Sequence, residues 1–165
     1  MMRPTDFHAL CERLCIVPWV ECDDSHGDPW IVGKAAYEVF RKSGINPRAD
    51  ATLILTAQLD DTVVGAVEAL TVPQTNELGE FSGFSFDMAV LPEHQGGTIG
   101  YELMLAAIQH GLAESPGPVL CRNWCTNIVA ARMLVRLFGF KETEQHARAD
   151  SKFSCTVEKW LRPQL

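Results

Sequence analysis

Hydrophobic residues recur at every second position in several segments of this chain, which is the spacing of a strand with one buried face. Residues 52–59 carry apolar side chains on one face, at Leu53, Leu55, Ala57 and Leu59. The acidic pair at 60–61 predicts a tight turn, and the apolar run 63–72 returns as the second strand of a hairpin. Within that run Gly65 indicates a bulge, and residues 73–79, which begin with a proline, are expected to form a loop.

The second half of the chain alternates between strand-like and helix-like runs. The expected order is strand, helix, strand, helix, strand, strand, over residues 81–90, 99–112, 119–125, 127–138, 140–146 and 153–160. Asn127 is a good N-cap for the second of these helices, and Gly139 is a good left-handed terminator. Because a hairpin precedes two strand–helix units, the pattern predicts an α/β (α+β) fold. We expect a mixed, mostly antiparallel central sheet with helices on both faces.

The first 50 residues carry helical periodicity instead. Residues 5–16 predict a short helix with four inward positions, Leu10, Cys11, Leu14 and Cys15. Residues 17–29 are expected to be irregular, and the Asp-Pro pair at 28–29 predicts the start of a second helix that ends at Gly44. No opening strand is evident before that helix.

The six cysteines are expected to be free thiols, because a chain of 165 residues can bury a core without covalent staples. His8, Cys11 and Cys15 form a stripe on the first predicted helix. This stripe is either half of a metal site or a buried face of small thiols. The second interpretation is favoured because the spacing matches no common zinc module, and we expect no metal.

Length and charge narrow the classes of function. A chain of 165 residues favours a single domain. The net charge of −7 argues against nucleic acid and anionic membranes as partners, and it mildly favours cationic substrates such as amines. No leader segment is visible, and no apolar run approaches the roughly 20 residues that span a bilayer, so we expect a cytoplasmic location.

The most informative stretch lies between the strand 81–90 and the helix 99–112. There the chain reads Gln-Gly-Gly-Thr-Ile-Gly over residues 95–100. The first N–H groups of a helix have no partner inside the helix, and they lie at the positive end of its dipole. A short glycine loop leading into such a terminus predicts a site for a phosphate or diphosphate group.

This segment resembles the acetyl-CoA loop of GNAT-type N-acetyltransferases, which reads Gln/Arg-x-x-Gly-x-Gly/Ala. Gln95, Ile99 and Gly100 match that pattern, and Val90, Pro92 and Glu93 match its usual lead-in, with one residue between the valine and the proline. Thr98 stands where the family prefers glycine. Its hydroxyl has two expected roles, capping the helix or donating to a phosphate oxygen.

A second signature follows downstream, where GNAT-type proteins carry an Asn, a helix and a Gly-Phe pair after their fifth strand. Asn127 and Gly139-Phe140 fit this segment. The tyrosine that often protonates the departing thiolate in the family falls on Leu134 or Val135 here, so the general acid differs from the usual one. The resemblance covers roughly residues 50 to 160. It implies one GNAT-like acetyltransferase domain over 1–165, with a divergent helical part over 1–50.

The resemblance implies acetyl transfer from acetyl-CoA to a primary amine of a small molecule or peptide. The residues expected to bind acetyl-CoA are Ala89, Val90, Gln95, Gly96, Gly97, Thr98, Ile99, Gly100 and Asn127. Asp87 is the candidate general base, because it is the only titratable residue from Phe81 to Val90, and its alternative role is a solvent-facing or salt-bridged carboxylate. Two other functions stay open, a catalytically silent acyl-CoA-binding module and an unrelated α+β binding domain. The chain is expected to act alone or as a homodimer.

Overall fold

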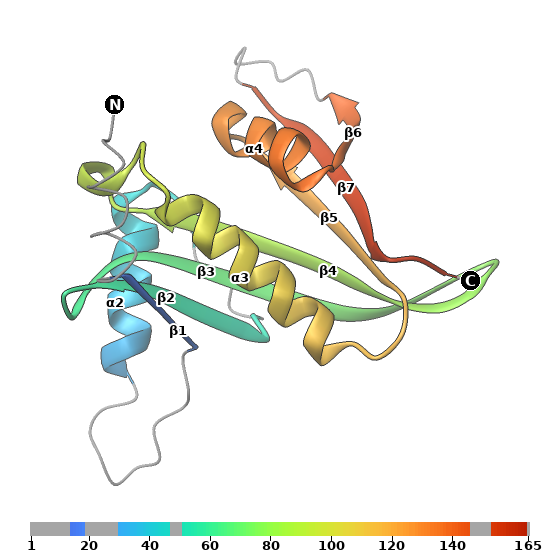
Figure 1. Cartoon of the computed structure of the whole chain (residues 1–165), viewed down its shortest axis with the longest axis horizontal. Coiled ribbons are helices and arrows are strands. Elements are labelled where there is room, and N and C mark those ends of the chain that lie inside the picture. Colours follow the sequence, from blue (N-terminus) through green and yellow to red (C-terminus); the bar gives the residue numbers. More distant parts are fainter. Residues whose placement is uncertain (1–13, 19–29, 47–50, 146–152, 165) are drawn as a thin grey trace, which may run out of the picture. The chain divides into compact units, whose positions relative to one another are not determined.

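A computed structural model of the chain describes residues 14–18, 30–46, 51–145 and 153–164 (Figure 1). Its elements are β1 Leu14–Pro18, α2 Trp30–Lys42, β2 Leu53–Leu59, β3 Thr62–Asn76, β4 Gly79–Val90, the 3₁₀ turn η1 Pro92–His94, α3 Ile99–Glu114, β5 Val119–Cys125, α4 Ile128–Phe138, β6 Lys141–Gln145 and β7 Cys155–Arg162. The seven strands form a sheet in the order β1-β2-β3-β4-β5-β7-β6. Strands β4 and β5 pair in parallel, whereas β1–β2, β2–β3, β5–β7 and β6–β7 are antiparallel. The predicted mixed α/β class is therefore confirmed.

The chain divides into two compact units. The first comprises residues 1–69 and 87–107, and the second comprises residues 70–86 and 108–165. Strands β3 and β4 and helix α3 contribute residues to both units.

In the first unit, helices cover both faces of the strands. Ala66 and Ala89 belong to one buried cluster with Val39 and Phe40 of α2. A Cβ placed on the neighbouring Gly65 would lie 2.9 Å from a methyl group of Leu103 on α3. Because neighbouring residues of a strand point to opposite faces, α2 and α3 pack on opposite sides. Glycine is needed at position 65 because α3 approaches the strand so closely.

The β2–β3 hairpin forms as the sequence predicts. Asp60 and Asp61 have φ of 48° and 65°, so both residues of the tight turn are left-handed. The register changes from Ala57–Gly65 to Gln58–Val63 across the two strands. The residue of β3 between Val63 and Gly65 therefore has no partner on β2. The predicted bulge is confirmed.

The predicted loop over residues 73–79 is wrong, because β3 continues through Asn76 and only a short turn separates it from β4. The backbone N–H of Leu91 donates to Val64 at 2.9 Å, which pairs these two residues across β3 and β4. In this register the odd-numbered residues of β3 direct their backbone groups away from β4. Strand β2 begins at Leu53, opposite Ala69, and the described ladder between β2 and β3 does not reach Pro73. Pro73 therefore faces an edge where no partner for a backbone N–H is needed.

The second unit is built on β5, β7 and β6, with α4 packed on β5 and β7 (Figure 1). The carboxamide of Asn127 accepts hydrogen bonds from Val129 and Ala130, and Gly139 ends α4 with a φ of 71°. Both predicted caps are confirmed. Leu137 lies on the outer face of α4 and is 63% exposed.

The prediction for the N-terminal region is wrong where it can be compared. Leu14–Pro18 is strand β1, paired with β2 at Leu14–Leu59, rather than the end of a helix. An opening strand is therefore present, and Cys15 is exposed. His8 and Cys11 lie outside the described residues. The four cysteines in the described segments, Cys15, Cys121, Cys125 and Cys155, are free thiols. No helix in these segments is long and apolar enough to cross a membrane.

Candidate active site

The loop after β4 begins with a tight turn that uses two of its amide groups. The N–H of His94 donates to the carbonyl of Leu91 at 2.8 Å, and the N–H of Gln95 donates to Pro92 at 3.3 Å. Proline at the first position of this turn needs no acceptor. The N–H of Gln95 already donates within the protein. It is therefore not available to a phosphate, although the sequence predicts that role for it.

The next five amides, from Gly96 to Gly100, point to an anion site. None of them donates to another residue in the described parts of the chain, and the first helical hydrogen bond runs from Glu102 to Thr98 at 3.0 Å. Gly96 has a φ of 82°, a left-handed conformation that glycine adopts without strain. Consecutive free N–H groups at the start of a helix attract a phosphate or diphosphate.

Thr98 adds an unusual polar group to this loop. Its Oγ1 is buried and has no hydrogen-bond partner among the described residues. The expected capping role of this hydroxyl is therefore wrong, since a capping oxygen would accept from the first turn of α3. A buried hydroxyl without a partner is unfavourable by about 1–3 kcal/mol, so an external acceptor is expected next to it. Its donation to a phosphate oxygen stays a prediction.

Two side chains fix the start of the loop on β4. The Nε2 of Gln95 donates to the carbonyl of Val90 at 2.8 Å, and the Oγ of Ser43 donates to the same carbonyl at 3.3 Å. The side chain of Gln95 thus holds the loop through the protein's own backbone. Ser43 lies at the end of α2, 47 residues from Val90, and no local pattern in the sequence links the two.

The register of β3 and β4 determines which backbone groups of β4 are available at its other edge. Since Leu91 pairs with Val64, Asp87 and Ala89 also direct their N–H and C=O groups toward β3. Met88 and Val90 direct theirs toward the opposite edge. Ala89, selected from the sequence for coenzyme binding, therefore has its backbone groups on the β3 side.

The parallel ladder between β4 and β5 is short. Beyond its last pair, a side chain of β5 accepts a backbone hydrogen bond from β4. The paired residues are Ser82–Val119, Gly83–Leu120 and Phe84–Cys121. The N–H of Phe86 then donates to Oδ1 of Asn123 at 3.0 Å instead of to the backbone of β5. Asn123 is only 5% exposed. A polar residue at an inward position of an alternating strand was a visible signal, but the sequence reasoning did not use it.

Comparisons with known proteins identify the family of this chain. A family model described as "Acetyltransferase (GNAT) family" matches residues 19–140. The chain belongs to the GNAT acetyltransferase family. Acetyl-CoA is accordingly its co-substrate, and acetyl transfer is its general chemistry. No curated protein matches the sequence significantly.

Solved GNAT structures share the fold at low sequence identity. Arabidopsis thaliana Naa50 in complex with the bisubstrate analogue CoA-Ac-MVNAL is 17% identical, with a TM-score of 0.58 over 89% of this chain and 98% of that one. Arabidopsis thaliana NAA60 with a bisubstrate analogue is 13% identical, with a TM-score of 0.60 over 89% and 98%. A GNAT-family acetyltransferase from Streptococcus pneumoniae is 14% identical, with a TM-score of 0.58 over 89% and 99%.

Two carboxylates of the first unit of this GNAT chain lie opposite each other on β3 and β4. Asp87 is partly buried and shares a strand face with Ala89, which packs beneath α2. The pairing of Val64 with Leu91 places Glu68 of β3 directly opposite Asp87. Glu68 is only 2% exposed, and both carboxylates have interaction partners. The sequence reasoning missed Glu68, because its proximity to Asp87 depends on the register of the hairpin.

Helix α4 lacks the acid that the GNAT pattern usually carries. Leu134 is 1% exposed and packs inward, and Val135 is 36% exposed, so the expected tyrosine position holds an aliphatic side chain in either alignment.

Burial raises the pKa of the Cys121 thiol, with a smaller contribution from Cys125. The Cys121 thiol is therefore protonated and unreactive at neutral pH.

Proposed function

We propose that this GNAT chain is an N-acetyltransferase that transfers the acetyl group of acetyl-CoA to a primary amine of a small molecule or a peptide. The observation that carries the proposal is the row of five amides from Gly96 to Gly100 without protein acceptors, next to the orphaned hydroxyl of Thr98. These groups fit a diphosphate, which offers several anionic oxygens to a small set of donors.

The coenzyme arm is proposed to follow the edge of β4. The backbone groups of Met88 and Val90 are directed there, so Met88 replaces Ala89 in the expected contact set. The carbonyl of Val90 already accepts from Gln95 and Ser43, which leaves its N–H as the group to offer. Asn127 retains an amide NH₂ that the helix cap does not use, and its contact with acetyl-CoA stays a prediction from the sequence.

The acceptor must reach the thioester as a neutral amine, because an ammonium group has no lone pair. We propose Asp87 as the group that takes the proton, directly or through water, with the buried Glu68 behind it. The net charge of −7 favours cationic amines as incoming substrates. The bisubstrate analogue bound to Naa50 contains a peptide, which supports a peptide amine as one class of acceptor.

The proposal is tested by measuring free CoA thiol released from acetyl-CoA with a panel of small amines and peptides. Turnover with at least one amine, and a large rate loss in Asp87→Asn with unchanged acetyl-CoA affinity, is the expected result. Glu80, an exposed carboxylate at the start of β4, supplies the matched control Glu80→Gln. Equal activity in Asp87→Asn and Glu80→Gln would remove Asp87 from the mechanism.

A second candidate is a catalytically silent acyl-CoA-binding module. The aliphatic side chains at Leu134 and Val135 favour it, since the usual proton donor is missing there. Such a module would show a thermal shift with acetyl-CoA but no CoA release with any amine. Absence of any shift at millimolar acetyl-CoA would reject both candidates.

A further inference from the structure

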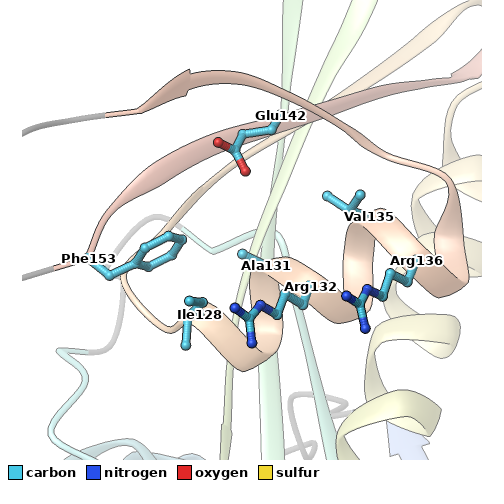
Figure 2. A pocket seen from close by; sticks show the side chains of 7 residues that line it. All are labelled: Ile128, Ala131, Arg132, Val135, Arg136, Glu142 and Phe153. Atoms are coloured by element: carbon cyan, nitrogen blue, oxygen red, sulfur yellow. The ribbon is translucent and has the colours of Figure 1, made fainter.

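A cavity of about 240 Å³ lies between α4 and β6 in the second unit (Figure 2). Its apolar wall consists of Ile128, Ala131 and Val135 from α4, together with the ring of Phe153 (Figure 2). Ile128 is 40% exposed, although β-branched side chains are not favoured on the solvent face of a helix. The cavity therefore offers an apolar surface for a group about as large as one side chain.

Arg132 and Arg136 lie one turn apart on α4 and extend in the same direction at the rim of this cavity (Figure 2). Both are exposed, and neither has a bonding partner among the described residues. The other described arginines are engaged: Arg41 and Arg122 pair with carboxylates, and Arg162 donates to backbone carbonyls. Two unpaired like charges at this spacing slightly destabilise a helix. The pair is thus available to an external anion.

Glu142 of β6 lies across the cavity from the two arginines (Figure 2). The pKa of the Cys155 thiol is raised first by burial and second by the charge of Glu142. Two guanidinium groups against one carboxylate leave one positive charge at the rim, in a chain whose net charge is −7. The net charge of the residues that line the cavity is therefore positive, whereas the net charge of the whole chain is negative.

We propose that this cavity binds a small amphipathic anion, with an apolar body of side-chain size against the apolar wall and one carboxylate between Arg132 and Arg136. A guanidinium group presents paired donors that match the two oxygens of a carboxylate. The excess positive charge selects an anion over a neutral or cationic molecule of the same shape. This site is separate from the glycine loop, and it does not depend on acetyl transfer.

Titration of the full chain with 3-phenylpropionate, followed by amide NMR shifts, tests the proposal. We expect saturable shifts at Ala131 and Val135, and binding about 5-fold weaker for the neutral 3-phenylpropionamide. Arg132→Gln and Arg136→Gln should each weaken 3-phenylpropionate binding about 3-fold. Arg122→Gln, an exposed arginine on β5, is the matched control and should leave it unchanged.

Glu142→Gln provides an independent check, because removing the opposing carboxylate should tighten binding of the anion. Weaker binding in Glu142→Gln would overturn the proposal and indicate a ligand with a cationic group. Equal affinity for the acid and its amide, or no saturable shift up to the solubility limit, would overturn it as well. A stable dimer that excludes the probe would assign the surface to a second copy of the chain instead.

Discussion

Thr98 has a buried hydroxyl without a partner at the start of α3, and a polar group in this state needs an acceptor that the described protein does not supply. Glycine, which the family pattern prefers at this position, would remove the hydroxyl and its desolvation cost together. Retaining threonine therefore makes sense if a ligand oxygen completes the hydrogen bond. At the scale of single residues, this is the chain's most specific departure from the family pattern.

Thr98→Val separates the two roles of this residue, since valine keeps the shape and removes the hydroxyl. The free energy of unfolding of the ligand-free protein should rise by about 1 kcal/mol, because the unpaired polar group is gone. The Kd for acetyl-CoA should rise roughly 10-fold, because a bond to a charged oxygen is lost. Thermal unfolding and calorimetric titration measure both. Unchanged affinity for acetyl-CoA would show that the hydroxyl does not reach the ligand.

Gln95 is expected to act through the carbonyl of Val90 rather than on the diphosphate itself. Gln95→Met removes the donor without adding charge, and it should raise the Kd for acetyl-CoA about 3-fold by loosening the loop. Gln95→Arg restores a donor, and it should recover affinity and the protection from hydrogen exchange of the His94 amide, which donates to Leu91 in the loop. A loss of affinity in Gln95→Met without faster exchange in the loop would point to direct contact with the ligand.

At the scale of elements, the side-chain bond between Asn123 and Phe86 marks the end of the β4–β5 ladder. Asn123→Ala should lower the free energy of unfolding by about 1–3 kcal/mol, because the N–H of Phe86 loses its acceptor in a buried position. The exchange rate of the Phe86 amide should rise in the same variant. Asn46→Ala, at an exposed position after α2, is the control. An unchanged Phe86 exchange rate would show that the backbone of β5 already satisfies this group.

The packing of α3 on β3 depends on the missing side chain at Gly65. Gly65→Ala would bring a methyl group to 2.9 Å from Leu103, and it should lower the free energy of unfolding by about 1–3 kcal/mol. Gly117→Ala has open space around the new Cβ and should stay within about 0.5 kcal/mol of the parent. Chemical denaturation measures both. Equal stability of the two variants would show that α3 can move away without cost.

Elements with local signals were predictable from the sequence, and elements fixed by distant partners were not. The ends of α4 follow from Asn127 and Gly139 alone, because capping is decided within a few residues. Strand β1 has only five residues, and its pairing with β2 has no local signature. In the site, the glycine loop was visible as a motif. Ser43 and Glu68 were not, because the tertiary fold brings them to β4.

At the scale of the whole molecule, the GNAT assignment rests on a family match over residues 19–140 and on shared fold with structures below 20% identity. Structural similarity at this low sequence identity shows the fold alone. The acceptor therefore has to be found by experiment. The proposal of an amine acceptor rests on the acidic net charge and on the position of Asp87 opposite Glu68. The cavity beside α4 has the opposite preference, for an anion, so the two sites should not compete for one ligand.

The most direct test of the central claim is an amide NMR titration of the full chain with CoA. The amides of residues 96–100 should show the largest shifts, and the hydroxyl variant Thr98→Val should reduce them at equal CoA concentration. Binding of CoA that leaves these five amides unperturbed would contradict the account, and so would no binding at millimolar CoA.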